Sequence, residues 1–291
     1  MTASKQIHFG IKTTQYVPYE DILRVWQEAD ELPLIEHAWL FDHPMPIMQS
    51  AASGYCPDGW TLLTALAAQT KRLRLGLMVA SNANQTPPQL AKRAATVDLI
   101  SNGRLEFGIG AGGVEREHTA YGTDYYPPAE RIRRLGEACE IIRRMWTEPV
   151  VNHAGRYYQF SEVYCEPKPI QKLPPFVIGA IGEQLTLRVV ARHAQVWNLP
   201  GHPHSSFEDF RRKSEILDGY CREIGRDPAE IARSVQLIVD PSAAVEATRQ
   251  VVREYIAMGA THIVIGPRRL EQGIAQWLCE EIIKPVMEAV G

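Results

Sequence analysis

An acidic residue and a histidine stand next to each other, Asp42-His43, directly after the apolar run Trp39-Leu40-Phe41. A carboxylate and an imidazole at the end of a buried strand can bind ligand hydroxyls or move a proton near neutral pH. The pair is therefore a candidate for acid–base chemistry. The alternative is a strand end that is capped by two solvated polar residues, and the dipeptide alone does not separate these interpretations.

Two glycine-rich segments, Gly108–Gly113 and Gly179–Gln184, each follow an apolar run. Glycine lets a ligand approach the backbone closely, and free N–H groups at a helix N-terminus bind phosphate. Ordinary βα turns also contain glycine, so this alternative stays open for the second segment. The first segment fits the spacing GxGxxG, but no acidic residue closes a following strand ~20 residues later, so a dinucleotide-binding fingerprint is not expected. Together the two segments predict an anionic cofactor at the strand ends.

Other chemistries find little support in the residue pattern. Glu115, Glu117 and His118 suggest a metal cluster, but no second histidine group has matching spacing, so no metal is expected. A GxSxG nucleophile elbow is absent. The five cysteines are scattered without metal-ligand spacing, which favours reduced thiols in a cytoplasmic protein.

The elements that must position these residues are clearest between Arg72 and Gly113. Two apolar runs, Leu73–Ala80 and Leu105–Ile109, flank an amphipathic segment, Gln89–Ile100, which Asn102-Gly103 closes with a turn. This pattern predicts a strand–helix–strand crossover whose second strand leads into the first glycine segment.

The same alternation repeats along the chain and predicts eight strands, each followed by a helix. The strands are expected at His8–Thr13, Ala38–Asp42, Leu73–Ala80, Leu105–Ile109, Phe176–Ala180, Val196–Leu199, Ser234–Val239 and His262–Gly266. The helices are expected at Tyr19–Leu32, Trp60–Gln69, Gln89–Ile100, Ala129–Trp146, Gln184–Ala194, Phe207–Ile224, Ala243–Met258 and Leu270–Glu288.

The predicted fold class is α/β, a (β/α)8 TIM barrel that forms one domain over residues 1–291. An open, doubly wound sheet is the alternative. Two β-prone runs around Ala154-Gly155 predict a β-hairpin insertion after helix four, at about residues 150–169, and the polar segment before Pro128 is expected to be a loop. In a parallel barrel the active site forms at the carboxyl ends of the strands, where both glycine segments and Asp42-His43 lie.

Composition limits the possible partners. The chain has 291 residues, of which 45% are hydrophobic and 22% are charged, and its formal net charge is −3. These values are typical of a soluble globular protein, and they favour neither nucleic acid nor an anionic membrane as a partner. No apolar run approaches the ~20 residues that span a bilayer, and the N-terminus lacks a signal-peptide core.

Three segments, Trp39–His43, Arg72–Gly113 and Pro174–Leu199, together resemble the bacterial luciferase-like superfamily of flavin- and deazaflavin-dependent oxidoreductases. Within it, the chain is most similar to the actinobacterial branch of coenzyme F420-dependent oxidoreductases. The resemblance covers nearly the whole chain. It implies a barrel with an insertion after helix four, a homodimer, and a non-prolyl cis peptide bond between Met78 and Val79.

The resemblance also assigns roles to residues. His43 and Asp42 are the expected catalytic pair, and Asp42 also contacts the deazaflavin. The other expected cofactor-binding residues are Met78, Val79, Ser81, Asn82, Gly110, Ala111 and Gly112, with Gly179, Ala180, Ile181, Gly182, Glu183 and Gln184 at the phosphate. Gly113 departs from the family's sugar-phosphate dehydrogenases, which carry a glutamate there, so Glu115 or His118 becomes a candidate proton donor.

The expected substrate pocket contains Trp39, Phe41, Gly113, Val114 and Trp197. Further candidates for an apolar wall are Met45, Met48 and Trp60, although core packing is the commoner role for such residues. Arg188, Arg268 and Arg269 are candidates for a basic groove that would hold the oligoglutamate tail of F420.

The resulting hypothesis is an F420-dependent oxidoreductase that transfers a hydride between the deazaflavin and a small organic substrate. The first alternative is an FMN-dependent monooxygenase of the same superfamily. A third, from another class, is a barrel that binds a ligand without catalysis.

Overall fold

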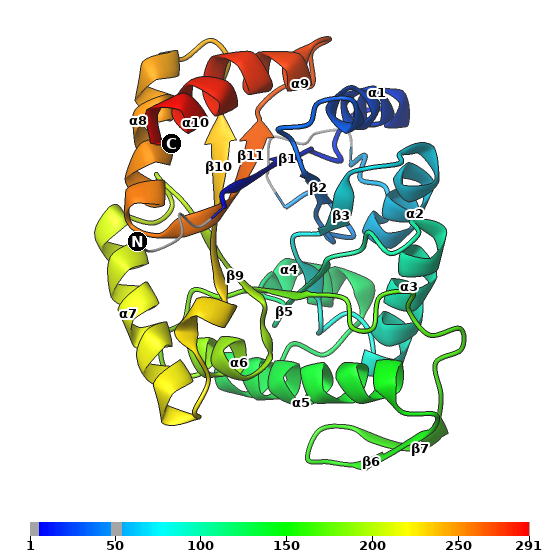
Figure 1. Ribbon diagram of the computed structural model, residues 1–291. Coiled ribbons are helices and arrows are strands. Elements are labelled where there is room, and N and C mark those ends of the chain that lie inside the picture. The colour runs from blue at the N-terminus through cyan, green and yellow to red at the C-terminus, as the bar shows by residue number, and fades with distance from the viewer. Residues whose placement is uncertain (1–5, 48–53, 291) are drawn as a thin grey trace.

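The computed structural model describes residues 6–47 and 54–290, and its central feature is a nine-stranded parallel sheet in the order β3-β2-β1-β11-β10-β9-β8-β5-β4 (Figure 1). Its strands are β1 (His8–Lys12), β2 (His37–Leu40), β3 (Arg74–Leu77), β4 (Ala80–Ser81), β5 (Phe107–Gly110), β8 (Phe176–Gly179), β9 (Val196–Pro200), β10 (Ala232–Val239) and β11 (Ala260–Pro267).

The helices pack around the sheet and cover its outer face (Figure 1). They are α1 (Tyr19–Asp30), α2 (Gly59–Gln69), α3 (Pro87–Ile100), α4 (Glu115–Tyr121), α5 (Pro128–Thr147), α6 (Thr186–His193), α7 (Phe207–Glu223), α8 (Val245–Ala257), α9 (Ile274–Trp277) and α10 (Lys284–Val290), with a 3-10 turn at Pro228–Glu230 and a π-helical segment at Leu278–Ile283.

The sheet closes into a ring because β3 and β4 are two parts of one strand position. β3 pairs with β2 on one side, and β4 pairs with β5 on the other. The backbone N–H of Glu106 donates to the carbonyl of Leu75 at 2.8 Å and joins the two edges. The interruption falls at Met78-Val79, whose peptide bond is cis. Nine strands therefore occupy eight positions, which confirms the predicted (β/α)8 barrel and excludes the open sheet.

Local sequence signals explain where several helices begin and end. Helix α3 starts with a capping box between Thr86 and Gln89 and has Pro87 in its first turn, where the missing N–H costs nothing. Its predicted stop is also present, since Asn102 (φ 57°) and Gly103 (φ 81°) both adopt the left-handed region. The crossover predicted around this helix is confirmed.

Two helical predictions are wrong in detail. The segment before Pro128, expected to be a loop, contains the seven-residue α4, which ends at Gly122 with φ 67°. So short a helix carries no apolar periodicity from which it could be recognised. The last helix begins at Ile274 instead of Leu270, and it continues through the π-helical segment before α10.

Strands β6 (Val151–Ala154) and β7 (Gln159–Val163) form a separate antiparallel pair. The backbone N–H of Gly155 donates to the carbonyl of Tyr158 at 3.0 Å and closes the turn between them. Figure 1 shows this pair outside the ring, next to α5.

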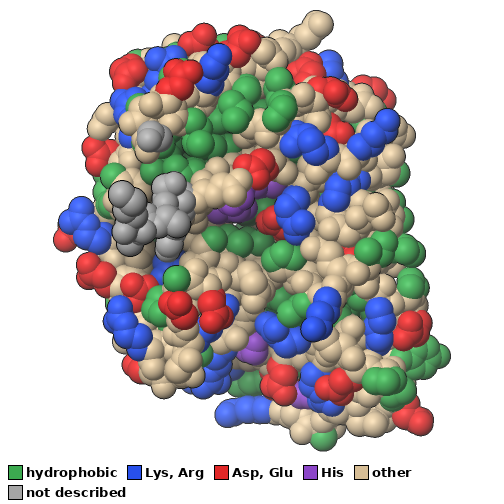
Figure 2. Space-filling model, in the orientation of Figure 1, with side chains coloured by type: hydrophobic (Ala, Val, Ile, Leu, Met, Phe, Trp, Pro, Cys, Tyr) green, Lys and Arg blue, Asp and Glu red, His purple; other side chains and the backbone are tan. Residues whose placement is uncertain are grey.

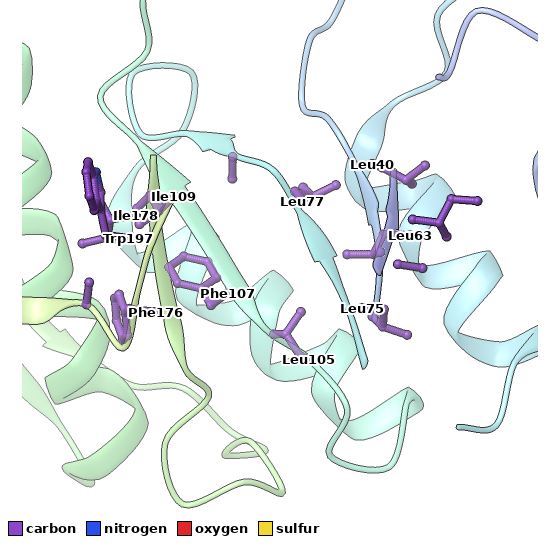
Figure 3. Packing of buried hydrophobic residues seen from close by; sticks show 14 of the residues in the cluster. Leu40, Leu63, Leu75, Leu77, Leu105, Phe107, Ile109, Phe176, Ile178 and Trp197 are labelled. Carbon is purple, nitrogen blue, oxygen red and sulfur yellow. The ribbon is translucent and has the colours of Figure 1, made fainter. Parts of the chain in front are cut away.

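Strand residues divide between two cores, because successive side chains point to opposite faces. Those that face the helices join a large cluster, part of which Figure 3 shows around Leu77, Phe107 and Ile178. Those that face the barrel axis form a smaller apolar cluster, built without helical residues from Trp39, Met78, Val177, Val196 and Val264.

A polar layer shares the barrel interior with this small cluster. The rings of His37 and His262 stack at a centroid distance of 4.0 Å, although β1 lies between their strands. The stack exists because β1 contributes Gly10 here, where a Cβ atom would fall 1.7 Å from Nδ1 of His37. Trp39 donates from Nε1 to this same Nδ1 at 2.6 Å. Burial, and then the neighbouring His262, lower the pKa of His37 well below its usual value, so the imidazole is neutral.

Acidic and basic side chains are interspersed on the face seen in Figure 2, without a large area of one sign. None of the helices in the described ranges is long and apolar enough to cross a membrane.

Close packing inside the barrel gives a test of the fold. A Cβ atom on Gly76 would lie 2.3 Å from the carbonyl oxygen of Glu106 and 2.6 Å from the Trp39 ring. We expect Gly76→Ala to lower the free energy of unfolding by about 1–3 kcal/mol through overpacking. Gly219→Ala on α7, where a Cβ meets nothing within 4 Å, should raise it by about 0.5–1 kcal/mol. Denaturant unfolding of both variants measures the difference, and equal effects would contradict this packing.

Candidate active site

Asp42 and His43 follow β2 at the carboxyl end of the barrel, as predicted. The Asp42 carboxylate is buried, with 8% exposure, and accepts a hydrogen bond from the backbone N–H of Ser81 at 3.2 Å. This bond joins the end of β2 to the end of β4, which continues the strand position of β3 beside β2. It therefore places the first predicted catalytic residue beside the predicted cofactor residue Ser81.

Burial raises the pKa of Asp42 from its ordinary 3.8 to about 7, and the nearby carboxylate of Asp58 adds to the rise. The hydrogen bond from Ser81 opposes it, because a donor favours the ionised form. A carboxyl group with such a pKa can hold a proton near neutral pH and donate it to a ligand oxygen or nitrogen.

The His43 ring is held by a carboxylate that reaches it from another loop. Its Nδ1 lies 2.7 Å from Oε1 of Glu117, whose side chain is only 6% exposed. Glu117 lies on α4, which follows β5, and the same helix contacts the loop after β2 a second time, because the Tyr121 hydroxyl donates to the carbonyl of Pro44 at 2.7 Å. The result is a histidine–carboxylate dyad at the barrel mouth.

The sequence pattern does not predict this dyad. The sequence suggests Glu117 only as part of a metal cluster with Glu115 and His118, and the described residues contain no group of three or more side chains suited to a metal. The contact spans 74 residues, and the only sequence signal was an acidic residue in a polar segment after a strand. His118 is buried and bonds Thr123 through Nδ1 at 2.9 Å, while Glu115 is exposed.

Three predicted cofactor residues meet beside the Met78-Val79 bond. Cβ atoms built on Gly110 and Gly179 would lie 2.7 Å and 3.2 Å from a methyl carbon of Val79. The two glycines thus provide the space that the Val79 side chain occupies, at the ends of β5 and β8. Met78 itself points into the barrel interior and is 5% exposed, so it lies below this surface.

A cavity of about 380 Å³ opens next to this position, at the ends of β4 and β5. Its wall carries amide, hydroxyl and guanidinium groups, and it includes Asn82, Asn84, Gln85, Thr86, Gln89, Ala111, Tyr126, Arg131, Arg134 and Tyr158. The side-chain oxygens of Asn82 and Gln85 are buried without a hydrogen-bond partner among the described residues. Such unpaired acceptors indicate a surface that a polar ligand completes.

The loop Gly179–Gln184 leaves three of its backbone donors open, although the N–H of Ala180 donates to the carbonyl of Asn198 at 3.1 Å. The N–H groups of Gly182, Glu183 and Gln184 make no hydrogen bond with the described residues, and the side chain before α6 does not cap the helix. This is the arrangement that binds an anion at a helix N-terminus. The Glu183 side chain turns away to pair with Arg212 on α7.

Two predicted substrate-pocket residues are misplaced. Trp197 faces the helices, where it stacks on Phe210, and Figure 3 shows it beside Ile178. With no exposed surface it cannot line a pocket. Trp39 faces the barrel axis but is also fully buried, so it lies beneath the mouth instead of lining it. The position of a tryptophan near a strand end does not show whether it lines the pocket. Trp197 points toward the helices because side chains alternate along the strand, and Trp39 points toward the axis but is covered by its neighbours.

The remaining predicted pocket residues have mixed outcomes. Phe41 is partly exposed, with its ring 5.5 Å from that of His43. Gly113 is exposed and Val114 partly so, directly before α4. Trp60 is packed in the helix-facing core, and Met45 is partly exposed after His43. Met48 lies outside the described residues.

The three arginines predicted to form a basic groove are engaged elsewhere. Arg188 pairs with Glu223 and lies over the Tyr220 ring on the helical layer. Arg268 pairs with Asp240 and Arg269 with Glu271. The cavity near Asn82 instead brings together Arg131 and Arg134.

A parallel eight-position barrel with polar and glycine residues at the carboxyl ends of its strands defines a TIM-barrel enzyme architecture. Residues 3–278 match the family of luciferase-like monooxygenases, and the chain belongs to this family.

Three similar proteins each match more than two thirds of this chain. An uncharacterised protein of Mycobacterium tuberculosis is 35% identical over 211 residues, which cover 72% of this chain and 69% of the relative. The F420-dependent glucose-6-phosphate dehydrogenase of Kineococcus radiotolerans is 29% identical over 231 residues, covering 76% of this chain and 65% of the relative. Among solved structures, an F420-dependent secondary alcohol dehydrogenase in complex with an F420–acetone adduct has a TM-score of 0.83 and 17% identity, with coverage of 98% and 99%.

The environment of Asp42 predicts an unusual dependence of stability on pH. The folded-state pKa is about 7 and the ordinary value is 3.8, so ionisation favours the unfolded chain as pH rises through this window. We expect Asp42→Asn to gain stability relative to the unsubstituted protein between pH 4 and pH 7, by at most about 4 kcal/mol. Denaturant unfolding across this pH range measures it.

Asp240 provides a control of opposite sign. Hydrogen bonds from the side chain and backbone N–H of Ser242 lower the pKa of Asp240, so its ionised form stabilises the fold above the ordinary value. Asp240→Asn should therefore lose stability relative to the unsubstituted protein as pH rises to about the ordinary pKa of 3.8, and the difference should then stay nearly constant from pH 5 to pH 7, where that of Asp42→Asn still grows. The same trend in both variants would show that Asp42 is not in the environment described.

Proposed function

We propose that this protein is an F420-dependent oxidoreductase that transfers a hydride between the deazaflavin and a small organic substrate. The observation that carries the proposal is the His43–Glu117 dyad, which lies at the barrel mouth in the same site as the buried carboxyl group of Asp42. Relatives that are named as F420-dependent dehydrogenases support the choice of cofactor.

The residues present fit such a cofactor. The unpaired oxygen of Asn82 and the carboxyl of Asp42 offer hydrogen bonds to a polar ring edge, and the open N–H groups of Gly182–Gln184 suit a phosphate. Arg131 and Arg134 line the adjoining cavity and offer guanidinium groups to the carboxylates of an oligoglutamate tail; Arg134 also pairs with Glu130 at 2.9 Å, and Asp124 lies in the same wall. When bound, the deazaflavin would supply or accept the hydride.

The protein's own contribution is to hold and move a proton. The carboxylate of Glu117 is hydrogen-bonded to Nδ1 of His43. This bond orients the ring and leaves Nε2 without a partner among the described residues. As a hydride reaches a carbonyl carbon, the C=O π bond breaks and the oxygen takes one proton; the reverse reaction releases it. His43 Nε2 would hold that proton, and the Glu117 carboxylate would stabilise the imidazolium form.

An FMN-dependent monooxygenase is the second candidate function, and the family match to luciferase-like monooxygenases favours it. The two arginines of the cavity weigh toward F420, since its tail carries carboxylates that FMN lacks. We also propose that the protein is a cytoplasmic homodimer whose single domain covers the chain, as the resemblance implies.

Competitive binding distinguishes the two cofactors. We expect F420 to bind purified protein with micromolar or tighter affinity and FMN at least about tenfold more weakly, a difference of about 1.4 kcal/mol. Fluorescence and calorimetric titrations measure both affinities. Arg134→Gln should weaken F420 binding and leave FMN binding nearly unchanged. Tighter binding of FMN would move the assignment to a monooxygenase and make oxygen consumption the next assay.

The dyad gives a second prediction. His43→Ala should lower kcat about 10²–10⁴-fold, because it removes the proton-transfer group, and leave F420 affinity within a few fold. Glu117→Gln should lower kcat by a smaller factor, on the order of tenfold, and shift its pH profile. His204→Ala, at an exposed histidine in the loop after β9, is the matched control and should leave kcat unchanged. Full turnover by His43→Ala would remove this residue from the mechanism.

A further inference from the structure

Lys12, the last residue of β1, places an amine inside the barrel at its carboxyl end. Its neighbour Ile11 belongs to the helix-facing core, so alternation turns Lys12 toward the axis. The ammonium donates from Nζ to Oε1 of Gln236 on β10 at 2.8 Å, although β11 lies between β1 and β10. Only a bond across the interior of the barrel can join these two side chains.

The strand between them leaves room for this bond. Gln236 is in register with Val264 on β11, and the next inward position of β11 is Gly266. A Cβ atom on Gly266 would lie 3.9 Å from Cβ of Lys12, so the missing side chain leaves the space beside the lysine free. Below it, Val264 belongs to the apolar interior cluster. Lys12 is therefore at the level where the closed interior gives way to the mouth, and it is partly exposed there.

The charge of Lys12 is unbalanced. Within residues 6–47 and 54–290, no carboxylate lies within 4 Å of its Nζ atom, and its one hydrogen-bond partner is the neutral amide of Gln236. An ammonium has three donors, so two stay available. Although the residue as a whole is partly exposed, desolvation of its ammonium group inside the barrel lowers the pKa of Lys12 from 10.5 to about 8. A bound anion would compensate the charge, which a neutral ligand could not do.

We propose that Lys12, oriented by Gln236, binds an oxyanion of the substrate, and that this enzyme therefore acts on an organic acid, as a carboxylate or phosphate ester. The inference rests on the proposed function, because it assigns the substrate class of the same site. It also separates the roles of the strand ends: β2, β4, β5 and β8 carry the proposed cofactor groups, and β1 and β10 carry the substrate group.

The test follows the Lys12 side chain itself by NMR of protein labelled with 13C at the lysine ε-carbon, with the resonance identified by its loss in Lys12→Met. The probes are inorganic phosphate, 2-oxobutanoate, and 2-butanone, a neutral ketone. We expect each anion to raise the titration midpoint of Lys12 from about 8 toward 10.5, and 2-butanone to leave it unchanged. The two anions distinguish phosphate from carboxylate recognition. The resonance of Lys71, on the surface, is the internal control.

A second variant keeps the test independent of folding defects. Gln236→Glu retains the lysine and supplies an internal carboxylate, so the midpoint should be raised without ligand and the response to anions should disappear. The proposal would be overturned if no anion raised the titration midpoint of Lys12. It would also be overturned if Lys12→Met lost F420 binding, because the lysine would then belong to the cofactor site. If anions raise the titration midpoint of Lys12 but F420 does not bind the unsubstituted protein, the oxyanion site is supported and the proposed cofactor is contradicted.

Discussion

The closed ring of parallel strands is the constraint on which the rest of this structure depends. Every second strand residue must fit a narrow interior, so a large side chain on one strand requires a small one on its neighbour. Gly10 makes space for the stack of His37 on His262, and Gly76 makes space for Trp39. Polar side chains in this interior find partners among the strands, as Ser234 on β10 does for Nδ1 of His262 and Trp39 for Nδ1 of His37.

The same geometry builds the site. Parallel strands bring all their carboxyl ends to one side of the barrel, so loops from distant parts of the sequence meet there. The bond from Ser81 to Asp42 joins neighbouring strand positions, and the contact of Glu117 with His43 joins loops whose strands, β5 and β2, are not neighbours in the sheet. Burial in this crowded region perturbs the acid–base properties of Asp42, and the His43 ring is fixed by a buried carboxylate. Both effects come from packing, since the residue types alone would be ordinary.

Much of this could be predicted from the sequence, because the signals are local. Apolar runs of strand length, amphipathic segments of helix length and the turn at Asn102-Gly103 depend only on nearby residues. The candidate site residues Asp42, His43, Gly110 and Gly179 can be proposed from the sequence because each stands at the end of an apolar run, and a barrel has its site at these points. Helix α4 was missed because seven residues are too few to establish a period.

The sequence by itself determined the fold class, the order of the elements and the chain positions from which a site could be built. The tertiary structure decided which of these positions act together. It paired His43 with Glu117 across 74 residues, turned Trp197 away from the mouth, and set Lys12 opposite Gln236 across an intervening strand. The physical reason is the range of the interactions. Secondary structure follows from neighbours in the chain, whereas a side chain's partners and solvation depend on how the ring of strands closes and on which loops meet at its mouth.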